Sequence, residues 1–145
     1  MNNEQLLQMY DAIRQQPDLL VKAAARKRLI NFARYMQPDL VLEPFHVVYY
    51  TLLDMFAHGK IRKMIVQQPP QHGKSGGSSR KLPAFMLGLD PDRKICIGSY
   101  AATIARDFNR DVQRIIDTPR YRELFPGTYL NGSNVVTMAN TYLRN

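Results

Sequence analysis

The loop Gln68-Pro69-Pro70-Gln71-His72-Gly73-Lys74-Ser75, residues 68–75, constrains the possible folds of this chain more than any other feature. The generic phosphate-binding loop has the pattern G-x-x-x-x-G-K-[ST] and joins a buried strand to a helix. Here the last three residues match, Gln68 replaces the first glycine, and two prolines stiffen the start of the loop. An apolar run precedes the loop and a helical pattern follows it. This context favours a phosphate site over the alternative, a surface turn before a basic helix.

The residues at the end of loop 68–75 suit the chemistry of a triphosphate. Successive backbone N–H groups at a helix N-terminus concentrate positive potential, and the amides from Gln71 to Lys74 can form such a nest. Gly73 lets the backbone approach phosphate oxygens, while Lys74 offers a cation to the β- and γ-phosphates and Ser75 offers a hydroxyl to Mg²⁺. The candidate site for ATP and Mg²⁺ is therefore contiguous: Gln71, His72, Gly73, Lys74, Ser75 and Gly76, with Lys74 as the catalytic candidate and Ser75 as the metal ligand.

The order of expected elements predicts an α/β fold with a P-loop parallel sheet. Two short apolar runs, 63–67 and 94–98, have the length and composition of buried strands. We expect a helix between them over 75–89, despite Gly76, Gly77 and the interior Pro83, and another helix over 101–117. Strand, helix, strand and helix in this order form the βαβ pattern.

The first part of the chain predicts helices only. Apolar residues at helical spacing indicate one helix that carries Leu6, Leu7, Tyr10 and Ile13, a second over 18–35 and a third over 44–57. We therefore expect an N-terminal helical lead-in over 1–43 and a nucleotide-binding domain over 44–145.

The charge balance favours a polyanionic partner. Lys and Arg number 20 against 12 Asp and Glu, which gives a net charge of +8. Arg106, Arg110 and Arg114 form a basic row on the helix expected over 101–117. The row would contact DNA phosphates or the nucleotide of a neighbouring subunit or, as we favour, form a solvated face with i, i+3 ion pairs to Asp107 and Asp111.

Cysteine usage and hydropathy indicate a soluble protein of the cytoplasm. The single cysteine, Cys96, excludes an intrachain disulfide and is expected to be a buried side chain in a strand. The N-terminus lacks the pattern of a signal peptide, and no apolar stretch is long enough to span a bilayer, so we expect no membrane association.

A second acidic motif is not evident after the loop. Hydrolysis in this class of protein uses an acid at the end of an apolar strand for Mg²⁺, usually followed by a glutamate that activates water. Asp90 is followed by Pro91, while Asp117 and Asp54 lie on expected helices. We therefore expect a chain that binds ATP weakly and hydrolyses it poorly or not at all.

From residue 45 to about 126, the chain resembles the N-terminal ATPase domain of phage terminase large subunits, the motors that package DNA. The resemblance depends on several blocks in order: Phe45-His46 before an apolar helix; the run from Ile65 to Ser75 with its Pro-Pro pair and a His before G-K-S; Pro83-Ala84-Phe85 with Leu87-Gly88 and Pro91; Ile97-Gly98-Ser99-Tyr100 with Ala105, Phe108, Arg110, Val112, Ile115 and Ile116; and Tyr121 with Phe125-Pro126.

The resemblance implies a RecA/ASCE-like P-loop ATPase domain that translocates double-stranded DNA into procapsids. Implied partners are double-stranded DNA, a terminase small subunit, a portal protein and further copies of the chain in a ring, in the cytoplasm of a bacterial host. Two departures stand out: Gln71 occupies a position that is often basic in the family, and the family is much longer, with a nuclease domain. We therefore expect a chain truncated before the Walker B strand. Another P-loop DNA-translocating or helicase-like ATPase, or a non-catalytic basic fragment that binds DNA or a protein partner, stays open as an alternative.

Overall fold

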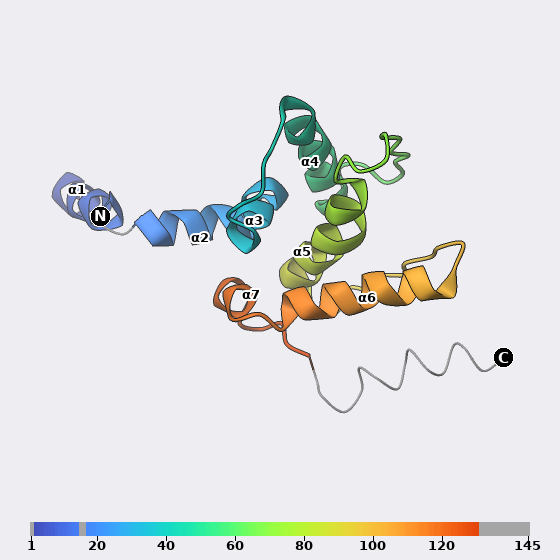
Figure 1. Ribbon diagram of the computed structural model, residues 1–145. Coiled ribbons are helices and arrows are strands. Elements are labelled where there is room, and N and C mark those ends of the chain that lie inside the picture. Colours follow the sequence, from blue (N-terminus) through green and yellow to red (C-terminus); the bar gives the residue numbers. More distant parts are fainter. Residues whose placement is uncertain (1, 15–16, 131–145) are drawn as a thin grey trace.

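Helices make up all the regular secondary structure of the computed structural model, which describes residues 2–14 and 17–130 (Figure 1). Seven of them are α-helices and one short segment is π-helical. In chain order they are α1 (Asn3–Arg14), α2 (Pro17–Lys27), α3 (Leu29–Met36), α4 (Pro44–Ala57), the π-helix η1 (Gly76–Lys81), α5 (Leu82–Leu89), α6 (Ala102–Ile116) and α7 (Pro119–Leu124).

The predicted parallel sheet is wrong for the described residues. Neither 63–67 nor 94–98 forms a strand, so the α/β P-loop class is replaced by an all-α arrangement. The reason lies in the backbone: a strand exists only where a neighbouring strand accepts and donates its hydrogen bonds. The two runs do not pair with each other, and each is an extended connection between helices.

Both extended segments nevertheless show a two-residue period in burial. Met64 and Val66 pack against the core, whereas Ile65 between them is 91% exposed. Ile95 and Ile97 are half-buried, whereas Cys96 is exposed, so the prediction that Cys96 is a buried strand residue is also wrong. One face of each segment is covered by helices and the other is open, and this is why the composition resembles that of a strand.

The helix predicted over 18–35 is two helices. Arg28 has an extended backbone, with φ −132° and ψ 128°, and this interrupts the helix between α2 and α3. The backbone N–H of Leu29, the first residue of α3, donates to Asp54 Oδ1 of α4 at 2.7 Å. Asp54 is buried and also lies 3.4 Å from Arg28 Nε. A side chain distant in sequence therefore satisfies an N–H group that the start of a helix leaves free.

The helix after loop 68–75 begins with an unusual turn. The Leu82 N–H donates to the carbonyl of Gly77, five residues earlier, which is the π-helical pattern. Pro83 follows directly, and its ring lacks an N–H and crowds the preceding turn of an α-helix. The wider π-turn precedes this proline, so α5 continues to Leu89 through the residue that seemed unfavourable in the sequence.

The core lies where α3, α4, α5 and α7 meet. Its centre is an aromatic cluster: the Phe32 ring lies 5.4 Å from Phe85, 6.0 Å from Tyr121 and 6.1 Å from Phe125, measured between centroids. Tyr121 is fully buried and its hydroxyl donates to the carbonyl of Ala84 at 2.8 Å. Such aromatic contacts at tilted angles stabilise a core beyond the area they bury.

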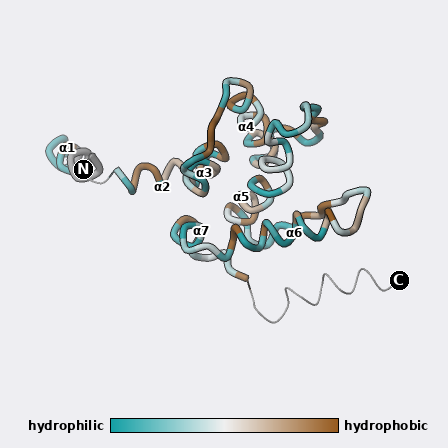
Figure 2. The backbone as a smooth tube through the Cα atoms, viewed as in Figure 1, coloured by the Kyte–Doolittle hydropathy of each residue, from teal (hydrophilic) through white to brown (hydrophobic). Residues whose placement is uncertain are grey.

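The helices α1 and α2 extend from this core as an arm (Figure 1). Arg26, at the end of α2, joins the arm to α7: its Nε donates to the Leu124 carbonyl at 2.8 Å and its Nη2 to that of Glu123 at 2.9 Å. Figure 2 shows hydrophilic and hydrophobic residues alternating along α6, as the predicted amphipathic helix requires. Among the described helices, none is both long enough and apolar enough for a bilayer span.

Three of the predicted helices are confirmed, and the first of them, predicted around residues 6–13, is α1. The helix over 44–57 is α4, with Pro44 in its first turn and His58 at its C-cap. The helix over 101–117 is α6, and its i, i+3 pairs are present, with Arg110–Asp107 at 3.8 Å and Arg114–Asp111 at 3.1 Å. The solvated-face interpretation of the basic row is therefore confirmed for these two pairs.

Candidate phosphate-binding loop

Loop 68–75 surrounds a cavity of about 470 Å³ at the start of η1. The predicted site residues Gln71, Gly73, Lys74 and Ser75 all line it, together with Gln68, Pro69 and Pro70. His72 and Gly76 are adjacent in the chain and are not part of the lining. The volume lies within the range of roughly 300–1,000 Å³ that small-molecule sites occupy.

The backbone of the loop turns twice through the left-handed region. Gln71 has φ 65° and Gly73 has φ 75°. Glycine adopts this conformation without a steric cost, whereas a glutamine does so at a cost of about 1 kcal/mol or more. Helical geometry begins directly afterwards, at Lys74 and Ser75. The loop is therefore curled immediately before a helix N-terminus, as an anion-binding nest requires.

Tyr49 of α4 supports the first helical turn after the loop. Its hydroxyl donates to the carbonyl of Lys74 at 2.6 Å, and the hydroxyl of Ser78 donates to the same oxygen at 2.9 Å. Burial raises the pKa of Tyr49, so its hydroxyl keeps the proton that it donates. Two hydrogen bonds thus hold the backbone carbonyl of the residue whose ammonium group would meet a phosphate.

Gly77 makes this support possible. A Cβ at Gly77 would lie 2.6 Å from Cε1 of the Tyr49 ring and 3.0 Å from its hydroxyl. In the sequence, Gly76 and Gly77 are poor helix formers at the start of the helix expected over 75–89. Close packing is present, and the partner is the ring of a tyrosine on a neighbouring helix.

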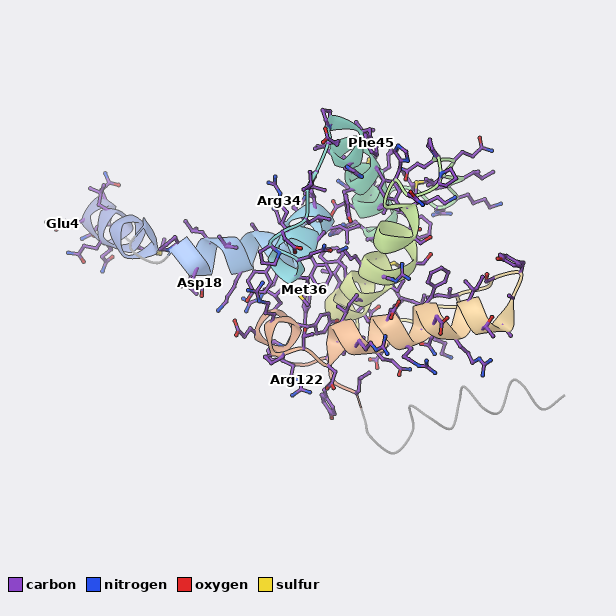
Figure 3. The ribbon with its side chains drawn as sticks, viewed as in Figure 1. Glu4, Asp18, Arg34, Met36, Phe45 and Arg122 are labelled. Atoms are coloured by element: carbon purple, nitrogen blue, oxygen red, sulfur yellow. The ribbon has the colours of Figure 1, made fainter. Side chains whose placement is uncertain are left out.

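An aromatic group flanks the loop on the side of α4. The ring of Phe45, labelled in Figure 3, lies 3.9 Å from that of His46 and 5.7 Å from that of His72. His46 Nδ1 accepts a hydrogen bond from the Glu43 N–H at 3.0 Å. His46 Nε2 then lies 3.4 Å from the position that a Cβ would take on Gly73. Phe45 and His46 are therefore placed beside the loop by the first turn of α4.

Gln68 presents a buried acceptor at the start of the loop. Its Oε1 atom is buried and has no hydrogen-bond partner among the described residues. An unsatisfied buried acceptor costs about 1–3 kcal/mol, so such groups are uncommon unless a site uses them. Gln68 also lines a second groove, of about 300 Å³, between α4 and the segment 64–68.

The acids weighed in the sequence lie away from the loop. Asp54 is buried against the start of α3, and Asp90 is at the C-cap of α5, at the far end of a helical stretch of roughly 20 Å. Asp117 is at the C-cap of α6. Among the described residues, no group of three or more His, Cys, Asp or Glu side chains is arranged to hold a metal ion.

Sequence reasoning missed the role of Tyr49, which lies within the helix expected over 44–57. The available signal was its spacing, since Tyr49 follows Phe45 by four residues and His46 by three, and such residues share a helix face. Comparison with models of protein families, with curated proteins and with solved structures finds no match to this chain.

Proposed function

We propose that loop 68–75 binds the phosphates of ATP together with Mg²⁺, and that the chain is the nucleotide-binding part of a terminase large subunit. The observation that supports this proposal best is the geometry of the loop. It curls through left-handed Gln71 and Gly73, begins a helix at Lys74 and surrounds a cavity lined by the predicted residues. In this proposal the resemblance supplies the motor, the double-stranded DNA substrate, the small subunit and the portal as partners.

Each loop residue has a distinct role in the proposal. The backbone amides from Gln71 to Lys74 bind phosphate oxygens, the Lys74 ammonium neutralises the β- and γ-phosphates, and Ser75 is a ligand of Mg²⁺. Phe45 and His72 offer aromatic faces at the rim of the loop for the nucleoside. Tyr49 orients the Lys74 backbone and does not contact the nucleotide.

Replacement of Lys74 tests the proposal. Lys74→Ala should weaken Mg²⁺-ATP binding by about 10- to 100-fold in an equilibrium titration, because a hydrogen bond to a charged group contributes about 1.5–3 kcal/mol. Lys60→Ala is the matched control, since Lys60 is also exposed and lies outside the cavity lining. Equal affinities for the wild type and Lys74→Ala would contradict the phosphate-loop assignment.

A second candidate function is that of a non-catalytic basic fragment that binds DNA or a protein partner. The lining of the loop cavity favours it, because Lys74 is the one charged residue among the seven and none of them is an acid. A turnover assay with Mg²⁺-ATP separates the candidates. Hydrolysis that disappears in Lys74→Ala would support the ATPase and reject the non-catalytic fragment.

A further inference from the structure

Another cavity lies beside the end of η1. It has a volume of about 410 Å³ and lies between the end of α3, η1 and the second half of α6. Met36, which is labelled in Figure 3, and Gln37 form one wall of it, and Arg80, Lys81 and Arg114 line the other. It shares no lining residue with the cavity of loop 68–75.

The charges in this cavity are unequal. Three cations, Arg80, Lys81 and Arg114, face one carboxylate, Asp111, which leaves two positive charges. Asp111 accepts from Arg80 Nε at 2.7 Å and from Arg114 Nη1 at 3.1 Å. Each guanidinium therefore keeps further N–H donors, since it carries five in all.

Lys81 is the one of these three cations that does not pair with Asp111. No hydrogen bond or ion pair joins its ammonium to any residue that the structure describes. Burial lowers its pKa and the nearby Arg80 lowers it further, while Asp39, outside the cavity lining, acts in the opposite direction. Its Nζ lies 3.9 Å from the position of a Cβ on Gly76, so the side chain folds back along η1. A half-buried cation without a partner is costly unless an anion neutralises it.

Arg80 is held in place before any ligand binds. The Arg80 guanidinium carbon lies 5.1 Å from the centroid of the Phe108 ring, in addition to its ion pair with Asp111. Arg114, whose side chain is 71% exposed, pairs with the same carboxylate from the next turn of α6. Pre-organised donors lose less conformational entropy when they bind an anion.

We propose that this cavity binds the phosphate group of a phosphomonoester through Lys81, Arg80 and Arg114. A phosphomonoester carries a charge of about −1.5 to −2 at neutral pH, which matches the two excess positive charges. Guanidinium groups bind phosphate oxygens in pairs, and a carboxylate would neutralise only half of the charge. The apolar side chains of Met36 and Ile115 complete the lining and accommodate the organic part of such a ligand.

The cavity shares no lining residue with that of the nucleotide loop, but Lys81 Nζ lies close to Gly76, so its test uses a background in which the loop is disabled. The experiment is calorimetric titration of the whole chain carrying Lys74→Ala with phenyl phosphate, and separately with inorganic phosphate. We expect one site for phenyl phosphate, tighter than for inorganic phosphate because its ring meets Met36 and Ile115. Adding Lys81→Met should weaken both affinities at least tenfold, and adding Arg114→Gln should also weaken them.

Arg110→Gln in the same background is the matched control. Arg110 lies one turn before Arg114 on α6, pairs with Asp107 and does not line the cavity, so affinity should not change. Lys81→Met should also raise the thermal midpoint, since it removes a half-buried charge, and this separates loss of the site from misfolding. If Lys81→Met raises the midpoint and leaves phenyl phosphate binding intact, the proposal is wrong.

Duplex DNA distinguishes the source of the phosphate group. The phosphates of duplex DNA are diesters with one negative charge each, so displacement of bound phenyl phosphate by a short duplex would contradict the match to a doubly charged monoester. Binding of duplex without competition assigns the cavity to small phosphomonoesters alone. Failure of ATP binding in the wild type would reject the proposed function of the loop and leave this site untouched.

Discussion

At the scale of single residues, Gly77 decides how closely α4 can approach the helix after the loop. The Tyr49 ring occupies the space that a side chain at position 77 would need. The same contact places the Tyr49 hydroxyl on the Lys74 carbonyl. The absence of a Cβ at Gly77 therefore allows both the packing of α4 and the hydrogen bond to the loop.

Gly77→Ala should destabilise the chain by about 1–3 kcal/mol, the usual cost of an overpacked position. It should also weaken ATP binding, because the Tyr49 ring must move away from Lys74. Gly76→Ala is the matched control for stability: it lies in the same π-turn, and its nearest neighbour is the flexible end of Lys81 at 3.9 Å. Chemical denaturation measures the stability of the two variants. Equal losses in the two variants would contradict the proposed clash.

Tyr121 should make the fold sensitive to alkaline pH. Burial raises its pKa above the ordinary value of 10.0, because the charged form would lie in the core. Below about pH 10 the neutral side chain contributes fully to stability. Above it, the unfolded chain releases a proton that the folded chain retains, so the free energy of unfolding falls as pH rises toward the folded pKa. Tyr50, with a pKa raised to about 12, adds to the same slope.

Tyr121→Phe tests this explanation. The variant should lose about 1–3 kcal/mol at neutral pH, since the Ala84 carbonyl loses its buried donor, and should show a shallower decline above pH 10. Tyr129→Phe serves as the control because Tyr129 is exposed. Denaturation curves at pH 7 to 11 measure the decline, and an unchanged alkaline slope in Tyr121→Phe would show that another group is responsible.

At the scale of elements, α3 begins where Asp54 accepts its first N–H group. Asp54→Ala should cost about 1–3 kcal/mol, because a buried N–H at the helix start is left without an acceptor. Asp107→Ala is the comparison, since its exposed pair with Arg110 contributes little. Urea denaturation followed by circular dichroism measures the stability loss of each variant. A loss no larger than that of Asp107→Ala would mean that α3 does not depend on this cap.

The sequence predicts elements well where local periodicity and chain punctuation agree, as in α4 and α6. It fails at Arg28, because nothing local breaks the helix there and the cause is a carboxylate on another helix. It fails at 63–67 and 94–98 because an alternating apolar run shows that one face is covered, not that a neighbouring strand exists. The position of the loop before a helix was predictable, whereas its support by Tyr49 depends on tertiary contact.

At the scale of the whole molecule, the net charge of +8 should dominate any contact with nucleic acid. Binding of duplex DNA, measured by fluorescence anisotropy, should weaken by more than about tenfold between 50 and 200 mM salt, since bound phosphates release counterions. Arg106→Glu, on the exposed side of α6, should reduce both the affinity and the salt dependence. DNA binding that does not respond to salt would argue against an electrostatic footprint.

The attachment of Arg26 to α7 also has a consequence for biosynthesis. Its contact with the Leu124 carbonyl joins residues 98 positions apart in the chain. A ribosome delivers α2 and α3 first, so the apolar surfaces of Leu29 and Phe32 emerge well before Tyr121 and Phe125 can cover them. We therefore expect this region to stay open to chaperones during synthesis, and the core to close only once α7 has been made.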